Sequence, residues 1–374
     1  MTVARLNEFG ETIFATMSAE AAKYDAINLG QGFPDSDGPA AMLRIAQEEI
    51  ARGNNQYSPI LGLPELREAV AIDRVVSPDN VLVTVGATEA LTASILGHVE
   101  PGAEVIVLEP YYDAYAAAIA LAGAKRVAVP LKAVGNTWDV DVAAVAAAVT
   151  SKTAMIIVNS PHNPTGAVFS RKALEELAQL CVGHDLLVLS DEVYEKLTFG
   201  SAQHTRIADL PGMWLRTITV SSAAKTFSCT GWKTGWAVAS RDLLDGVVKA
   251  KQFMTFVGAT PFQPAVAYAL RQEREWVQGL VADLDRKRNL LADGLRTCGY
   301  HVHDSAGTYF VVADVGMDGV RYCQELPQRA GVAAIPLSAL TDHPDQWSTK
   351  VRFAFCKNEK VLAQAIHKLR GQAK

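Results

Sequence analysis

Short apolar runs alternate with amphipathic stretches through the middle of the chain. Strands that are separated by helices of this length need crossover connections, which leave the strands parallel and both faces of the sheet covered. The expected strands are at 81–85, 104–108, 154–158 and 186–189, and the expected helices begin near 88 and span 112–122 and 171–182. A further run at 236–239 is a candidate antiparallel strand. The pattern predicts an α/β fold, in which ligands bind at the carboxyl ends of the strands.

The pattern changes from about residue 273 onward. A long charged helix, three short strands and a closing helix are expected at 273–298, 308–313, 332–335, 351–355 and 359–369. This order predicts a smaller α+β domain. The segment up to about residue 38 is rich in Gly and Pro, so we expect it to be irregular and to join the smaller domain or form an arm. The expected division is an arm at 1–38, a large domain at 39–272 and a small domain at 273–374.

Composition excludes several classes of protein. The 374 residues are 49% hydrophobic, which is enough for a large core, and the net charge of −5 comes without a basic stripe, which argues against a nucleic-acid partner. The first residues are partly acidic and contain no apolar segment, so we expect no signal peptide, no membrane span and a cytoplasmic protein. Five cysteines lack CxxC spacing, so we expect no disulfide framework and no metal site. Cys229 is expected to be a small packing residue.

Lys225 is the most informative single residue. It follows the apolar run at 217–220, with Ser221 and Ser222 before it and a second cation, Lys233, eight positions later. Burial or a nearby cation lowers the pKa of a lysine amine, which frees its lone pair to form a Schiff base. Taken alone, the same pattern is also typical of a solvated lysine in a loop after a strand.

Other polar residues stand where strands are expected to end. Gly86 and Thr88 open a helix after the first strand, which would make an anion site of that junction, although capping alone would also explain Thr88. Asn159 and Asn163 lie on a turn stiffened by prolines. Asp191 follows a buried run and needs a cationic or N–H partner, or else forms an ion pair with a core Arg or Lys.

Together these residues suit one ligand with a phosphate, an aldehyde, a basic ring nitrogen and a flat face, which describes pyridoxal 5′-phosphate. Over nearly its full length, the chain resembles the fold-type I, class I/II aminotransferases. Seven stretches in order carry the resemblance: Asn-Leu-Gly-Gln-Gly-Phe-Pro-Asp at 28–35, Asn-Gln-Tyr at 55–57, Gly-Ala-Thr-Glu-Ala at 86–90, Asn-Pro-Thr-Gly at 163–166, Ser-Asp-Glu-Val-Tyr at 190–194, the lysine segment at 221–230 and Val-Arg-Phe at 351–353. The resemblance implies a large domain with a mainly parallel seven-stranded sheet and a smaller α+β domain.

The resemblance also implies roles for the cofactor-binding residues. Lys225 would form the Schiff base, Asp191 would keep the ring nitrogen protonated, and Tyr194 with Asn163 would bind the phenolic oxygen. The stacking residue would be Tyr112. The phosphate would be held by Ala87, Thr88, Ser222 and Lys233, with Tyr57 reaching it from a neighbouring subunit of a homodimer. Lys225, Asp191 and Tyr194 are the residues expected to be catalytic.

Substrate contacts follow from the same resemblance. Arg352 would bind the substrate α-carboxylate with its planar fork, together with Asn163, and Gly32 would let the backbone approach. Phe14, Phe33 and, from the partner, Phe256 are candidates for the side-chain wall. The implied reaction is a ping-pong exchange of an amino group between an amino acid and a 2-oxo acid.

The motifs are most similar to one branch, which contains kynurenine/glutamine, methionine and bacterial N-succinyldiaminopimelate aminotransferases. Details at 221–225, 261–266, 303–305 and 331–336 look most like the last group, so N-succinyl-LL-2,6-diaminopimelate with 2-oxoglutarate is the expected pair. Kynurenine, glutamine, aromatic or methionine exchange is the alternative, and a cysteine-S-conjugate β-lyase would use the same residues. A transcription regulator with an aminotransferase-like domain would need a basic DNA-binding module, which the sequence lacks.

The chain departs from the family at two places. Relatives carry roughly ten more residues between Arg74 and Val75, and the chain is also short near 313–318. Either the loops are compact, or mobile segments are missing from the sequence.

Overall fold

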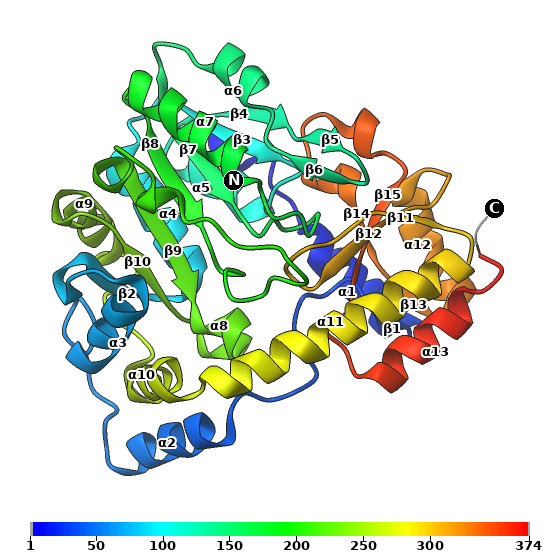
Figure 1. The fold of residues 1–374 in the computed structure, drawn as a ribbon, viewed down its shortest axis with the longest axis horizontal. Helices are drawn as coiled ribbons and strands as arrows, with labels where there is room; N and C mark the ends of the chain where they lie inside the picture. The colour runs from blue at the N-terminus through cyan, green and yellow to red at the C-terminus, as the bar shows by residue number, and fades with distance from the viewer. Residues whose placement is uncertain (1–2, 373–374) are drawn as a thin grey trace.

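The computed structural model describes residues 3–372, so the outermost residues of the expected N-terminal arm and C-terminal domain, 1–2 and 373–374, lie outside the described residues. Figure 1 shows a larger body built on a twisted sheet and a smaller body beside it. The long helix α11 (Arg274–Thr297) runs from the larger body, where α10 (Gln263–Gln272) ends, to the smaller body, where it packs beside α13 (Glu359–Leu369).

The larger sheet has seven strands in the order β2-β10-β9-β8-β7-β3-β4. Their bounds are β2 Val81–Val85, β3 Glu104–Glu109, β4 Lys125–Pro130, β7 Thr153–Asn159, β8 Leu187–Asp191, β9 Thr217–Ser222 and β10 Thr234–Val238. Only β10 is antiparallel to its neighbours, β2 and β9. This confirms the predicted mainly parallel seven-stranded sheet, including its antiparallel strand.

Both faces of this sheet are buried, which explains the continuous apolar runs. In β3, Ile106 and Leu108 pack in one core cluster with α7 (Arg171–Gly183), whereas Val105 and Val107 pack in another with α4 (Gly86–His98) and α5 (Asp113–Leu121). Because the parallel strands share one direction, their carboxyl ends meet at the same edge. The residues that follow β2, β7, β8 and β9 are therefore gathered at that edge.

Further helices surround the larger sheet and one hairpin projects from it. The helices are α2 Ala40–Ala51, α3 Pro64–Arg74, α6 Val142–Ala148, α8 Ala223–Thr226 and α9 Arg241–Lys251, and the hairpin is β5 Lys132–Val134 with β6 Thr137–Asp139. Helix α3 packs against α10 and β2, which holds its last turn firmly beside the sheet.

The smaller body has a four-stranded antiparallel sheet in the order β11-β12-β15-β14. Its elements are β11 His301–Val302, β12 Phe310–Asp314, α12 Gly319–Ala330, β14 Ile335–Pro336 and β15 Lys350–Ala354. The strand expected at 332–335 is instead two short strands, because β13 (Val332–Ala333) pairs with β1 (Ile27–Asn28) while β14 pairs with β15.

The N-terminal segment contains a helix that the sequence analysis missed. Helix α1 (Ile13–Lys23) begins after Thr12, whose side chain accepts a hydrogen bond of 3.2 Å from the Ala15 N–H. It packs against α12, β13 and β14 and buries Met17 and Ala21. The expectation of an irregular segment was wrong here because its Gly and Pro residues lie on either side of the helix.

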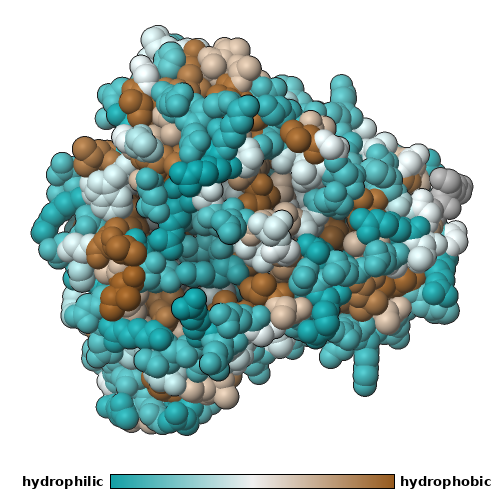
Figure 2. Space-filling model, in the orientation of Figure 1, coloured by the Kyte–Doolittle hydropathy of each residue, from teal (hydrophilic) through white to brown (hydrophobic). Residues whose placement is uncertain are grey.

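The two short places in the sequence are compact turns. Val75 ends α3 in a left-handed conformation, with φ of 61°, and its N–H is directed to the carbonyls of the last turn. After β12, the Asp314 side chain accepts a hydrogen bond of 3.0 Å from the Gly316 N–H, just before α12 begins. The surface seen in Figure 2 is mostly hydrophilic, with apolar residues in separate patches. None of the helices in the described chain has the length and apolarity to span a membrane.

Candidate active site

The predicted cofactor residues gather around one cavity of about 260 Å³ at the carboxyl edge of the large sheet. Its lining includes nine of the ten: Ala87, Thr88, Tyr112, Asn163, Asp191, Tyr194, Ser222, Lys225 and Lys233. A second cavity of about 340 Å³ shares four of these, Tyr112, Asn163, Tyr194 and Lys225, and adds Phe14, Gly32 and Arg352. The two cavities therefore meet at Lys225. Larger hollows of about 850 and 860 Å³ lie elsewhere, so chemistry rather than size identifies the site.

Lys225 lies in the short helix α8, directly after β9, and is partly accessible through the cavity. Its Nζ donates a hydrogen bond of 3.3 Å to the Gly32 carbonyl and lies 5.6 Å from the ring centroids of both Tyr194 and Tyr309. Burial lowers the pKa of Lys225 to about 8, and Arg352 and Lys233 act in the same direction. A lysine in this environment carries a useful fraction of neutral amine near physiological pH.

Asp191 is the last residue of β8 and is buried. Its carboxylate accepts hydrogen bonds from the Tyr115 hydroxyl at 2.6 Å and from the Val193 N–H at 3.3 Å, and it forms no ion pair with a described Arg or Lys. The alternative of a core ion pair at Asp191 is therefore wrong. Burial raises the pKa of Asp191 to about 6, although the hydrogen bonds from Tyr115 and Val193 oppose that shift. A protonated ring nitrogen in the cavity would supply the missing positive charge.

Tyr115 and Tyr309 are site residues that the sequence analysis did not single out. Tyr115 follows Tyr112 by three positions on α5, a spacing that places both on one helix face, and this was the available signal. Tyr309 packs edge-on against Tyr194, and its hydroxyl is buried without a hydrogen-bond partner. No local pattern pointed to Tyr309.

The asparagine turn is tied to the neighbouring strand. The Asn159 side chain donates to the Asp191 carbonyl at 2.9 Å and accepts from the Asn163 N–H at 2.8 Å. Asn163 lines both cavities, and its side-chain oxygen accepts a hydrogen bond of 2.9 Å from Arg352. The amide nitrogen of Asn163 is then the part of this side chain that can donate to a ligand.

Positive charge and backbone N–H groups meet at the start of α4. Gly86 has φ of 71°, and a Cβ added there would lie 3.1 Å from Lys233 Nζ, so the ammonium group lies beside the helix N-terminus. A Cβ on Gly235 would come within 2.7 Å of the Gly86 carbonyl carbon, which explains why the neighbouring strand has glycine here. With Thr88 and Ser222 on the same wall, this end of the cavity suits a phosphate group.

Arg352 is almost fully buried on β15, yet no described carboxylate pairs with it. Its guanidinium donates to the Asn163 side chain at 2.9 Å and to the Gly30 carbonyl at 2.6 Å, while Nε has no hydrogen-bond partner. It lies between the rings of Phe310 and Phe14, at 4.0 and 5.0 Å from their centroids. Burial lowers the pKa of Arg352 to about 10. An anion entering the cavity would meet an unneutralised guanidinium.

The remaining predicted residues lie outside these cavities in the single chain. Tyr57 is 81% exposed and Phe256 is 44% exposed, and their rings contact each other with centroids 5.5 Å apart. Phe33 is also exposed, with the Lys357 ammonium 4.1 Å from its ring centroid. Gly32 does line the second cavity, and a Cβ there would come within 2.6 Å of the Phe310 ring.

Comparison with known proteins agrees with this geometry. Residues 24–369 match the family described as aminotransferase class I and II. The chain is 50% identical to a probable N-succinyldiaminopimelate aminotransferase, DapC, of Mycobacterium tuberculosis, with 99% of this chain and 98% of that protein covered. It is 39% identical to the methionine aminotransferase of Escherichia coli, with 98% and 97% covered.

Solved structures support the same assignment. The structure of N-succinyldiaminopimelate aminotransferase from M. tuberculosis superposes with a TM-score of 0.98 at 50% identity, and all of both chains is covered. The chain therefore belongs to the class I and II aminotransferases, a family that depends on pyridoxal phosphate.

Proposed function

We propose that this member of the class I and II aminotransferases binds pyridoxal 5′-phosphate and exchanges an amino group between N-succinyl-LL-2,6-diaminopimelate and 2-oxoglutarate. The observation that carries the cofactor assignment is one cavity lined by Lys225, Asp191 and Lys233, each suited to a different part of that molecule. The 50% identity to the probable M. tuberculosis enzyme over nearly the whole of both chains supports the substrate.

The residues fit the cofactor at three separate points. The glycine-lined start of α4, with Lys233 beside it, suits the phosphate. The buried Asp191 has only neutral donors around it and suits a protonated ring nitrogen. Lys225 has a lowered pKa and lies between these two ends, where it would hold the aldehyde carbon covalently.

Each predicted residue keeps a defined task in this proposal. The phosphate would contact Ala87, Thr88, Ser222 and Lys233, the ring face would contact Tyr112, and the phenolic oxygen would accept hydrogen bonds from Tyr194 and Asn163. Burial raises the pKa of Tyr194, so its hydroxyl stays a neutral donor. Bound cofactor supplies an electron-withdrawing ring that stabilises negative charge at the substrate Cα. When the amino group of the substrate takes the place of Lys225 on the aldehyde carbon, the freed neutral amine of Lys225 would remove and return the proton at the substrate Cα.

Arg352 would bind the substrate α-carboxylate, since its guanidinium has no other anion within the described chain. Asn163 would orient the same end, and the missing side chain at Gly32 leaves room for the backbone to approach. The wall facing the substrate side chain would include Phe14 and Phe33, with Tyr57 and Phe256 of a second copy. The exposure of Tyr57 and Phe256 in the single chain supports a homodimer with shared sites.

The domain boundaries are part of the same proposal. An arm at 1–38, a large domain at 39–272 and a small domain at 273–374 would put Lys225 and Arg352 in different domains. Closure of the small domain would then bring the guanidinium toward the bound substrate.

Two alternatives use the same site. Methionine exchange is the first, because the E. coli methionine aminotransferase is 39% identical over nearly its full length, and kynurenine, glutamine or aromatic exchange belongs to the same class of alternatives. A cysteine-S-conjugate β-lyase is the second, and it would release pyruvate and ammonia. Neither changes the roles of Lys225 and Asp191.

The test is a half-reaction screen, in which the absorbance of the bound cofactor is followed as single amino acids are added. N-succinyl-LL-2,6-diaminopimelate should react fastest. A faster reaction of methionine or kynurenine would reassign the substrate, and pyruvate with ammonia would indicate the lyase.

The lysine is tested separately. Wild-type protein should be yellow, and borohydride should bleach it and leave the reduced adduct on Lys225, as identified by mass spectrometry. Lys225→Ala should abolish turnover, while the cofactor stays bound through its phosphate contacts. An adduct on a different lysine would overturn the assignment of Lys225.

A further inference from the structure

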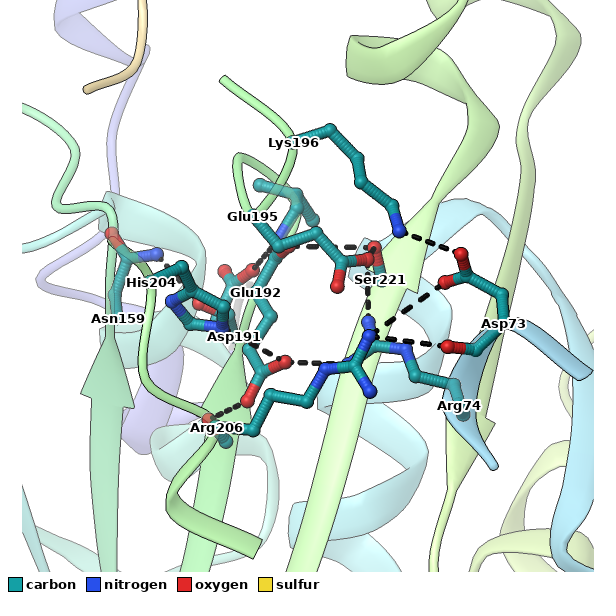
Figure 3. Close-up of polar contacts among 12 residues, drawn as sticks. Asp73, Arg74, Asn159, Asp191, Glu192, Glu195, Lys196, His204, Arg206 and Ser221 are labelled. Atoms are coloured by element: carbon teal, nitrogen blue, oxygen red, sulfur yellow. Dashed lines mark hydrogen bonds and ion pairs between the residues drawn. The ribbon is translucent and has the colours of Figure 1, made fainter. Parts of the chain in front are cut away.

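Arg74, Glu192 and Glu195 form a buried ion-pair cluster next to the chain segment that lines the cofactor cavity, and Figure 3 shows its polar contacts. Their side chains are 4%, 0% and 4% exposed. Arg74 Nη1 donates to Glu192 Oε2 at 2.6 Å, and Nη2 donates to Glu195 Oε1 at 2.5 Å. One guanidinium therefore joins two carboxylates through separate arms of its fork.

Each of the two glutamates directly follows a residue that lines the cavity. Asp191 and Tyr194 line the cavity, while Glu192 and Glu195, which directly follow them, bind Arg74. The Glu192 N–H also bonds to the carbonyl of β9 residue Val220 at 2.8 Å. Because adjacent residues share a peptide bond, fixing each glutamate limits the movement of the cavity residue before it.

The cluster also reaches β9. The Ser221 hydroxyl donates to Glu195 Oε1 at 2.9 Å, and the next residue, Ser222, lines the phosphate end of the cavity. Three cavity residues, Asp191, Tyr194 and Ser222, are thus each one position away from a member of the network.

Arg74 is anchored independently of the cavity. It is the last residue of α3, whose buried Leu66 and Val70 pack in the core with β2 and α10. A metal site is the alternative interpretation of this cluster, because Glu192, Glu195 and His204 present ligand atoms within 4.8 Å of one another. The guanidinium bonds to both carboxylates, and His204 lies 3.2 Å from Glu192 as a second basic group, so the cluster has cationic partners without a metal ion.

We infer that Arg74, Glu192 and Glu195 are positioning residues that hold Asp191, Tyr194 and Ser222 at the geometry the cofactor ring and phosphate require. The inference rests on the proposed cofactor site. None of the three touches that site, so each acts through its neighbour in the chain. A displacement of a catalytic group by about 1 Å can cost on the order of a hundredfold in rate, which gives the cluster a measurable effect.

The principal variant is Glu195→Gln, which keeps the shape and the acceptor for Ser221 but removes the charge that Arg74 binds. Tyr194 should then donate less well to the phenolic oxygen of the cofactor. The proton on the lysine–cofactor linkage should be held more tightly, so the midpoint of the absorbance titration should rise by about one pH unit, the size of one weakened hydrogen bond. We expect kcat to fall about tenfold with KM nearly unchanged, because Arg352 is not disturbed.

Arg74→Lys tests the fork itself, since a single ammonium cannot pair with both glutamates in parallel geometry. It should shift the titration as Glu195→Gln does. The matched control is Glu104→Gln, which removes the charge of another buried carboxylate, one that pairs with Lys125 and Thr150 at the start of β3 and has no contact with the cluster. It should leave the titration midpoint and kcat unchanged, whatever it does to the melting temperature.

Two readouts do not depend on turnover. Affinity for pyridoxal 5′-phosphate should fall in both cluster variants, and hydrogen exchange at 190–195 in cofactor-free protein should become faster. Ser221→Ala removes only the hydroxyl that contacts Glu195 and the Glu192 carbonyl, and it should show a smaller shift in the same direction, which keeps the test available where the charge variants do not fold.

The outcomes separate the two proposals. Wild-type protein that does not bind the cofactor would refute the proposed function and this inference with it. Normal wild-type binding, with titrations and exchange rates in Glu195→Gln, Arg74→Lys and Ser221→Ala that match wild type, would refute the positioning role alone. A shift in Glu104→Gln as large as in Glu195→Gln would also overturn it, because loss of general stability would then explain both.

Discussion

Asp191 and Glu192 are neighbours in the chain and both are buried, yet their acidities shift in opposite directions. Burial raises the pKa of Asp191 to about 6, because only neutral donors oppose it strongly. Burial acts on Glu192 as well, but His204 and Arg74 outweigh it and lower the pKa of Glu192 to about 2. Asp191 faces the cavity and has no ion-pair partner among the described residues, whereas Glu192 forms ion pairs with Arg74 and His204.

The two buried arginines repeat this contrast. Burial works against the charge of Arg74, but Glu195 and Glu192 raise its pKa above the ordinary value. Arg352 has only amide and carbonyl acceptors, and burial lowers its pKa to about 10. Burial alone therefore does not identify a functional charge in this protein. The absence of a partner within the chain does, because the ligand is expected to supply it.

The largest expected effect is a difference in the free energy of unfolding between variants of the two arginines. Arg74→Met removes the guanidinium that two buried carboxylates share, leaves only His204 and serine hydroxyls beside them, and should lower the free energy of unfolding by about 3–5 kcal/mol. Arg352→Met removes a buried charge that has no ion pair, so cofactor-free protein should be no less stable than wild type. Urea denaturation of both variants measures this. Equal losses would erase the distinction between the two sites.

In catalysis we expect the opposite order for the two arginines, with the larger loss of activity at Arg352. Arg352→Lys replaces a bidentate contact to the α-carboxylate with a point charge, which is worth about 1.5–3 kcal/mol, so kcat/KM should fall roughly tenfold to a hundredfold. The loss should be similar for every α-amino acid, because all of them present the same carboxylate. A loss confined to some amino acids would mean that Arg352 recognises side chains.

The pH dependence of stability tests the difference between the unpaired Asp191 and the paired Glu192. A carboxyl with a raised folded-state pKa contributes stability that is present below its unfolded value near 4 and is lost as pH rises through about 6. Asp191→Asn removes this dependence. Relative to wild type, the cofactor-free variant should therefore gain about 2 kcal/mol between pH 4.5 and 7.5.

Denaturation at the two pH values, with and without cofactor, measures the difference. Cofactor should reverse the order at pH 7.5, because its ring nitrogen would pair with the ionised Asp191. A difference between the two proteins that does not change with pH would show that Asp191 is already neutralised in the cofactor-free state.

The smallest effect is expected for a variant at Val75. This variant tests whether changes at Arg74 act through the charge of Arg74 or through the geometry of the end of α3. Val75 is 87% exposed and left-handed, a conformation that a β-branched residue adopts at a cost. Val75→Asn should raise the free energy of unfolding by about 1 kcal/mol and leave the cofactor titration unchanged. A shifted titration would mean that changes at Arg74 act through the helix end instead of through the glutamates.

The sequence predicted the parts of this molecule that depend on local pattern. Buried parallel strands appear as apolar runs, and polar residues at their ends must meet at one edge, so Asp191, Asn163 and Lys225 could be placed together in advance. Helix α1 has the spacing of Ile13, Met17 and Ala21 that indicates a buried face, but glycines and prolines around it obscured the pattern.

The second layer of the site could not be predicted in this way. Tyr115 bonds to Asp191 across 76 positions, and Arg74 bonds to Glu192 across 118. Such pairings depend on how helices pack on the sheet, and the spacing of one element does not contain that information. The crossing of Tyr57 and Phe256 to a second subunit stays a prediction, because it concerns contacts beyond one chain.

The order of residues at 190–195 makes this segment sensitive to its length in a way that substitutions do not reveal. Deleting one residue before Asp191 would move every later residue back by one position, so that Glu192 would take the place of Asp191 in the cavity and Glu195 that of Tyr194. The turn after Arg74 differs, since it already connects α3 to β2 with few residues and faces solvent. A change of chain length at that turn would leave Asp191 and Tyr194 in place relative to Glu192 and Glu195, whereas a change within 190–195 would not.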